Sequence, residues 1–236
     1  MKNSPNDESF IPEIHNYCDR WCERCPFTAR CRVFAMEQVS PDDAADIETV
    51  VQKLTDIFAE AKQMLIEKAD ELGIDPFAMS DEEFAEIRRR EKQFVDSDEL
   101  SQLADRYWRS AKEILDGDLP GDDEFYRDIL SVLEWYLFFI PVKVKCGLHG
   151  LLDHDGFEDP TQLTDSQSYA NGTVKIGLIA IERSLLAWNQ LAETGHADRV
   201  DSVMELLEKI MVQLEERFPL ARDFIRPGFD EIDVVM

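Results

Sequence analysis

Four of the five cysteines lie in one run of fourteen residues near the start of the chain, at Cys18, Cys22, Cys25 and Cys31. The fifth, Cys146, is more than a hundred residues away. Because only two to five residues separate successive members of the run, all four thiolates can turn toward one common centre. The spacing therefore predicts that these four cysteines are the ligands of a metal centre.

Two kinds of centre fit the spacing C-x3-C-x2-C-x5-C: a tetrahedral zinc ion and an iron–sulfur cluster held by four thiolates. We favour a 4Fe–4S cluster, because all four ligands come from one continuous winding and Pro26 directly follows a ligand. Zinc stays the alternative. Disulfides are disfavoured, because a long helical chain without a secretion signal does not require them. Aromatic and basic residues that could shield the centre and offset its charge alternate with the ligands: Tyr17, Trp21, Phe27, Phe34, Arg20, Arg24, Arg30 and Arg32.

The stretch Cys22–Cys31, with the pattern C-x2-C-Pro-Phe-x3-C, resembles the end of the 4Fe–4S loop in DNA glycosylases of the endonuclease III type. It is similar as well to the iron-staple cysteines of CRISPR-associated and AddB-like nucleases, and to part of the auxiliary-cluster motif of SPASM radical enzymes. The resemblance implies a cluster on these cysteines and nothing about the fold. Cys18 lies closer to Cys22 than the glycosylase pattern requires, so only the four ligand positions are carried over.

The charge of the chain restricts its partners. Its 236 residues carry 25 Lys and Arg against 50 Asp and Glu, a formal net charge of −25. Such a surface repels phosphate backbones and anionic lipid, which argues against nucleic-acid and membrane partners. The first residues lack the apolar core of a secretion signal, and no apolar run is long enough to span a bilayer. We therefore expect a cytoplasmic protein with a protein partner, and a dimer is compatible with its apolar tail.

Apolar residues recur at three- and four-residue steps through most of the chain, which predicts an all-α fold. We expect a cysteine module over residues 1–39, followed over residues 40–236 by an acidic bundle of about six helices, with the tail from Leu220 packed on it. The longest connection without helical signal is 151–167. The expected helices lie at about 40–72, 80–97, 98–116, 122–149, 168–194 and 197–218.

Polar residues inside the two most apolar helices form a second set of candidates. Glu134, His149 and Glu182 could act as catalytic acids or bases in a pocket between these helices, and Cys146-x-x-His149 could form a metal pair. A network of salt bridges that fixes helix register explains the same residues. The sequence therefore leaves three functions: an iron–sulfur protein with a structural, redox or sensing role, a zinc-clipped interaction scaffold, and an enzyme.

Overall fold

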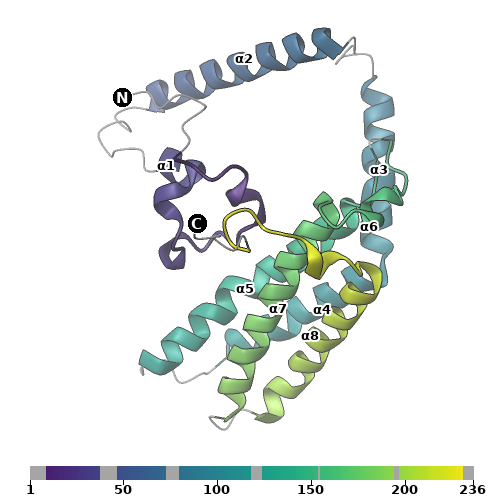
Figure 1. Ribbon diagram of the computed structural model, residues 1–236. Helices are drawn as coiled ribbons and strands as arrows, with labels where there is room; N and C mark the ends of the chain where they lie inside the picture. Colours follow the sequence, from purple (N-terminus) through teal and green to yellow (C-terminus); the bar gives the residue numbers. More distant parts are fainter. Residues whose placement is uncertain are drawn as a thin grey trace, which may run out of the picture.

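The computed structural model describes residues 9–37, 47–72, 80–117, 124–153, 155–193 and 197–230, and these residues are predominantly helical (Figure 1). The described part of the chain contains no β-strand, only one isolated bridge between Leu152 and Glu158. The predicted all-α class is therefore confirmed. Within the same residues, no helix is both long enough and apolar enough to cross a lipid bilayer.

Four helices form the core of the protein: α4 (Glu99–Leu115), α5 (Glu124–His149), α7 (Tyr169–Leu191) and α8 (Ala197–Arg217). The α5 and α7 helices make the most extensive contact, and α4 and α8 pack against them and against each other. The side chains that fill the space between the four helices are almost fully buried. Large side chains among them are Trp188, Tyr107, Tyr136, Leu133, Ile140 and Ile181.

The helix starts follow from capping side chains that the sequence shows. Ser80 and Glu83 form a capping box at the start of α3 (Asp81–Ser97), in which each side chain bonds to the other's backbone N–H. Asp98 ends α3 and caps α4 by accepting from Leu100 N at 2.9 Å. Ser168 caps α7 in the same way. Three of the predicted boundaries are thus fixed by local hydrogen bonds.

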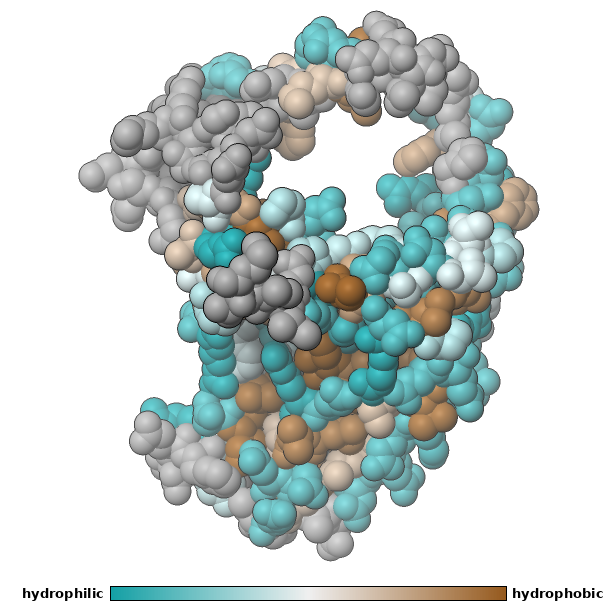
Figure 2. All heavy atoms as spheres, viewed as in Figure 1, coloured by the Kyte–Doolittle hydropathy of each residue, from teal (hydrophilic) through white to brown (hydrophobic). Residues whose placement is uncertain are grey.

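We expected the long helix α2 (Ile47–Leu72) to join the bundle, but it lies apart from the bundle helices. In Figure 1 it crosses one end of the molecule away from the other long helices, and Figure 2 shows an opening between this end and the bundle. Several of its apolar side chains are exposed, among them Val51, Leu54, Phe58 and Leu65. The predicted start of this helix at Ser40 lies outside the described residues.

Shorter elements complete the fold and hold the cysteine run against the bundle. Three 3-10 turns, η1 (Ile14–Tyr17), η2 (Cys22–Arg24) and η3 (Thr28–Arg30), precede the short helix α1 (Arg32–Glu37). The connection at 151–167 contains a further short helix, α6 (Thr161–Thr164), which we did not predict. After α8 the chain forms η6 (Ala221–Asp223) and then runs along the cysteine run.

Candidate functional site

The 3-10 turns determine where the four cysteines lie. Cys18, Cys25 and Cys31 each directly follow one of the three turns, and Cys22 is the first residue of η2. The N–H groups of Cys25 and Cys31 close their turns by bonding to Cys22 O and Thr28 O, both at 3.2 Å. A chain that turns this tightly before three of the four cysteines can direct their side chains toward one side.

All four cysteines line the same small cavity, of about 20 Å³, and each is partly buried. Cys146 lies elsewhere, in a separate cavity that it shares with His149. The structure thus brings together the four predicted ligands and excludes the fifth cysteine. Apolar and aromatic side chains complete the walls of this cysteine cavity, among them Ile14, Trp21, Phe34 and Phe229.

No group of three or more His, Cys, Asp or Glu side chains in the described residues is arranged so that it could hold one metal ion. Four thiolates around zinc at 2.3 Å would lie only about 3.8 Å from one another. None of the five cysteines, all of which are within the described residues, forms a disulfide.

Burial disfavours ionisation of Cys18 in the cysteine cavity. It raises the pKa of Cys18 above its usual value, and the neighbouring Arg20 backbone N–H and guanidinium oppose this only in part. The Cys18 thiol donates to His15 O at 3.5 Å, and Cys25 Sγ accepts from Phe27 N at 3.4 Å. Without a metal, the environment therefore favours the protonated thiol of Cys18, and metal binding would release its proton.

Two cations lie near the cysteine cavity. Arg20 lines it, with a positive φ of 60° that is unusual for a residue other than glycine. Lys143 of α5 is close enough to Cys18 to interact electrostatically, although burial lowers the pKa of its ammonium group. The sequence suggested Arg24 for this role as well, but its guanidinium lies over the Trp21 ring and pairs with Asp128.

Asp19 connects the cysteine run to the bundle. Its carboxylate accepts hydrogen bonds from Tyr136 OH at 2.7 Å and from Arg183 Nη1 at 2.5 Å, and its carbonyl oxygen accepts from Trp135 Nε1 at 3.0 Å. Trp21 stacks on Trp135 with ring centroids 5.0 Å apart. Side chains from both α5 and α7 therefore fix the loop between Cys18 and Cys22.

The chain after α8 covers the other side of the cysteine run. Phe224 packs on Tyr17 and Phe229 packs on Phe27, with ring centroids 4.5 Å and 5.0 Å apart. The residues of this tail are held in turn by Asp230, which pairs with Lys175 of α7 and with Arg226. Phe224 and Phe229 of the tail therefore pack on aromatic side chains of the cysteine run.

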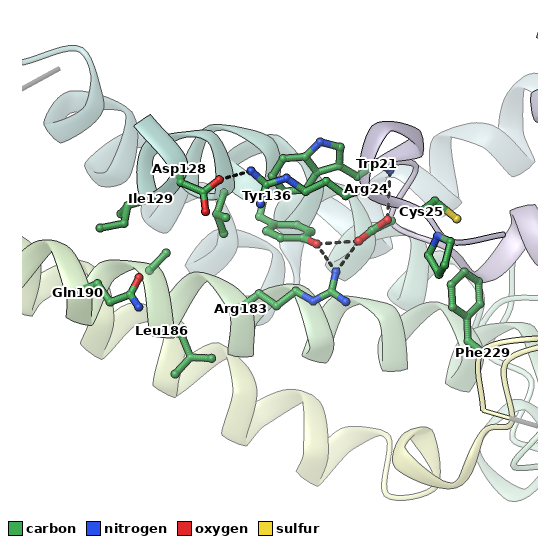
Figure 3. Close-up of a pocket in the computed structure, with 14 residues that line it drawn as sticks. Trp21, Arg24, Cys25, Asp128, Ile129, Tyr136, Arg183, Leu186, Gln190 and Phe229 are labelled. Atoms are coloured by element: carbon green, nitrogen blue, oxygen red, sulfur yellow. Dashed lines mark hydrogen bonds and ion pairs between the residues drawn. The ribbon is translucent and has the colours of Figure 1, made fainter. Parts of the chain in front are cut away.

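A second, larger cavity of about 470 Å³ lies beside the first, between the cysteine run, α5 and α7 (Figure 3). Arg24 and Arg183 reach it from the cysteine run and from α7, and Asp128 of α5 pairs with Arg24. Gln190 lies toward its other end. Four residues line both cavities: Asp19, Trp21, Cys25 and Phe229. We call this second space the arginine cavity.

The three residues suggested for acid–base chemistry have different surroundings. Glu182 pairs with Arg222 at 2.8 Å, and His149 Nε2 lies 3.5 Å from Glu91 Oε2, in the cavity that also contains Cys146. Glu134 is exposed on α5, fifteen residues before His149. At about 1.5 Å per residue this separates Glu134 and His149 by roughly 22 Å along the helix. The structure does not bring the three together.

Little in the sequence indicates which residues hold the cysteine run in place. Tyr136 follows the helical pattern of core residues, and Arg183 is the residue directly after Glu182. Both meet Asp19, which is more than a hundred residues away from either. One signal was available, namely a carboxylate directly after the first cysteine ligand in a loop otherwise rich in Arg.

Comparison with protein-family models, with curated proteins and with solved structures found no match to this chain. The proposals below are therefore based on the residues and their geometry alone.

Proposed function

We propose that this chain is a cytoplasmic iron–sulfur protein. Its 4Fe–4S cluster is held by Cys18, Cys22, Cys25 and Cys31 and has a structural, redox or sensing role together with a partner protein. The observation that carries the proposal is that these four cysteines line one cavity, whereas Cys146 lines another. Four thiolates supply the complete ligand set of such a cluster.

The surroundings of the cysteine cavity support a cluster in three ways. Aromatic side chains from the cysteine run and from the tail limit access of water, and Trp21 is itself backed by Trp135. The Phe27 N–H already donates to a ligand sulfur, which is a contact that tunes cluster potentials. Arg20 and Lys143 place positive charge near a centre that would be anionic. When bound, the cluster would supply one-electron redox chemistry.

A zinc-clipped interaction scaffold is the second candidate, favoured by the size of the cysteine cavity. A volume of about 20 Å³ is close to the space of a single water molecule. In either case the metal would stabilise residues 14–31 against the bundle, because the ligands are close together only in the folded state.

Exposed apolar side chains support a protein partner. Val51, Leu54, Phe58 and Leu65 recur on α2 at three-, four- and seven-residue steps, and each is about half or more exposed. A helix that presents such a stripe to water is typical of a surface used for association. The cytoplasm is the proposed compartment because four thiols stay reduced there.

Anaerobic purification of the full chain tests the proposal. We expect a brown protein with a broad visible absorption band and with about four iron and four sulfide per chain. Each of Cys18→Ser, Cys22→Ser, Cys25→Ser and Cys31→Ser should reduce the iron content, and Cys146→Ser should leave it unchanged. A colourless protein with one zinc per chain would contradict the cluster and support the zinc-clipped scaffold. A protein that binds neither metal would overturn both.

A further inference from the structure

The arginine cavity has the size and composition of a small-molecule site. Its volume of about 470 Å³ lies within the range of natural ligand pockets, about 300 to 1,000 Å³. Most of its lining is apolar, with a few polar groups, as ligand pockets usually are. The apolar part comes from α5 and α7: Ile129, Val132, Leu186 and Ala187.

The two arginines retain donors for a ligand. Both hydrogen bonds that Arg183 makes within the described residues use Nη1, and both that Arg24 makes use Nη2. A guanidinium has five N–H donors, so within the described part of the chain Nε and the second terminal nitrogen of each arginine stay available. The side chains are half exposed, at 50% and 44%, so a ligand that enters the cavity can reach them. Such a fork fits a carboxylate with two parallel hydrogen bonds.

The charge of the lining selects the kind of anion. Asp19 and Asp128 lie beside the arginines, so the charged side chains of the cavity sum to zero in a chain whose net charge is −25. A phosphate dianion would be repelled by these two carboxylates and by the chain as a whole. A monoanion loses less to this repulsion and gains the same contact with the arginines. An apolar body on the anion would cover the Ile129 and Leu186 side of the cavity.

We propose that the arginine cavity binds a small monocarboxylate with an apolar body, held by Arg183 and Arg24. Asp19, Trp21, Cys25 and Phe229 line both cavities, so a bound carboxylate would contact the walls of the metal centre. This second part rests on the proposed metal centre: ligand binding and the properties of the metal are coupled through these four residues. Binding itself requires only the arginines and the apolar wall.

Titration calorimetry on the full, metal-loaded chain tests the binding. The probes are 3-phenylpropionate, its uncharged amide 3-phenylpropanamide, and inorganic phosphate. We expect saturable binding of the carboxylate, at least tenfold weaker binding of the amide and no saturable binding of phosphate. Arg183→Gln should weaken carboxylate binding at least tenfold, and Arg89→Gln, on α3 and outside the lining, should not change it. Leu186→Trp fills the cavity from an exposed position, which leaves the core intact, and should abolish binding.

Equal affinity for the carboxylate and its amide would overturn the proposal. So would unchanged binding by both Arg183→Gln and Leu186→Trp, or the absence of saturable carboxylate binding. The coupling has its own readout, a shift of the visible spectrum or reduction potential when 3-phenylpropionate is added, and no shift at saturation would contradict it. If no cluster forms, the calorimetric comparison still decides whether the cavity binds a carboxylate.

Discussion

The phenol of Tyr136, in the middle of α5, donates a hydrogen bond of 2.7 Å to the carboxylate of Asp19, the residue directly after the first predicted metal ligand. Arg183 of α7 donates to the same carboxylate oxygen and to the phenol oxygen. One small polar group therefore fixes the cysteine run to both central helices.

Asp19→Asn should loosen the cysteine run. The amide keeps the size of the carboxylate and leaves its main-chain bond to Trp135 possible, but it removes the negative charge that faces Arg183. We expect the free energy of unfolding to fall by about 1–2 kcal/mol, less than for a fully buried pair because Arg183 is half exposed. Denaturant unfolding followed by tryptophan fluorescence measures this. Glu86→Gln, in an exposed pair on α3, should show no measurable change.

Stability should decrease at alkaline pH because of two buried phenols. Burial raises the pKa of both Tyr107 and Tyr136 from 10.0 to about 12, and the Asp19 carboxylate adds to the shift of Tyr136. Folding thus favours the neutral phenols, so their contribution is complete below pH 10 and is lost as the pH rises from about 10 toward about 12. Denaturant titrations across this range check the loss.

Tyrosine variants test whether Tyr107 and Tyr136 cause the loss of stability at alkaline pH. Tyr136→Phe and Tyr107→Phe should each make the free energy of unfolding less dependent on pH between 10 and 12. Tyr169→Phe removes a phenol from a ring that is 53% exposed and should leave the dependence as it is. The same slope in all four proteins would show that these phenols do not control it.

Two glycines of α7 provide a matched test of how tightly the cysteine run packs. A Cβ at Gly172 would lie 2.5 Å from Tyr17 Cε1 and 2.6 Å from Phe224 Cε2, whereas at Gly177 the nearest atom is Lys143 Cβ at 3.4 Å. We expect Gly172→Ala to lower the free energy of unfolding by about 1–3 kcal/mol through overpacking. Gly177→Ala should be neutral or stabilise by up to about 1 kcal/mol through helix propensity. Equal effects would mean that Tyr17 and Phe224 do not press on Gly172.

Acid should release the tail. Burial opposes ionisation of Asp230, but hydrogen bonds from Arg226 and Lys175 outweigh it and hold the pKa of this carboxyl well below its usual 3.8. The ionised form therefore stabilises the fold at pH values above 3.8, and this contribution decreases as the pH falls below that value. Asp230→Asn should imitate the acid state at neutral pH.

Limited digestion with chymotrypsin measures this release, because Phe224 is only 3% exposed while the tail is in place. Cleavage after Phe224 should be several-fold faster in Asp230→Asn than in the parent protein. Asp201→Asn, at an exposed position on α8, is the control and should be cleaved at the parent rate. Protection of Phe224 in both variants would contradict a role for Asp230 in holding the tail.

The parts of the fold that could be predicted are those encoded locally. Ser80, Asp98 and Ser168 each accept a capping hydrogen bond from a backbone N–H two or three residues later. The starts of α3, α4 and α7 can therefore be predicted from a short stretch of sequence. The position of α2 is not readable in this way. Its apolar stripe has the same periodicity whether or not another helix covers it, and the structure leaves Phe58 71% exposed.

The same distinction between local and long-range contacts applies to the candidate site. Cysteine spacing is local, and the four thiols do line one cavity. The arginine cavity depends on Arg183 meeting a loop that is 164 residues earlier in the chain, and no pattern within α7 specifies that meeting. Glu134 and His149 show the reverse case, in which residues that looked related on one helix lie too far apart along it to act together.

The contact between Phe27 and Phe229 joins residues 202 positions apart. During synthesis, the cysteine run leaves the ribosome long before α7 and the tail that enclose it exist. The nascent thiols are then open to a metal donor on the side that the tail later covers. If the proposed metal centre forms, its insertion would be easiest before this last segment docks, and its removal would first have to undo the aromatic contacts of Phe224 and Phe229.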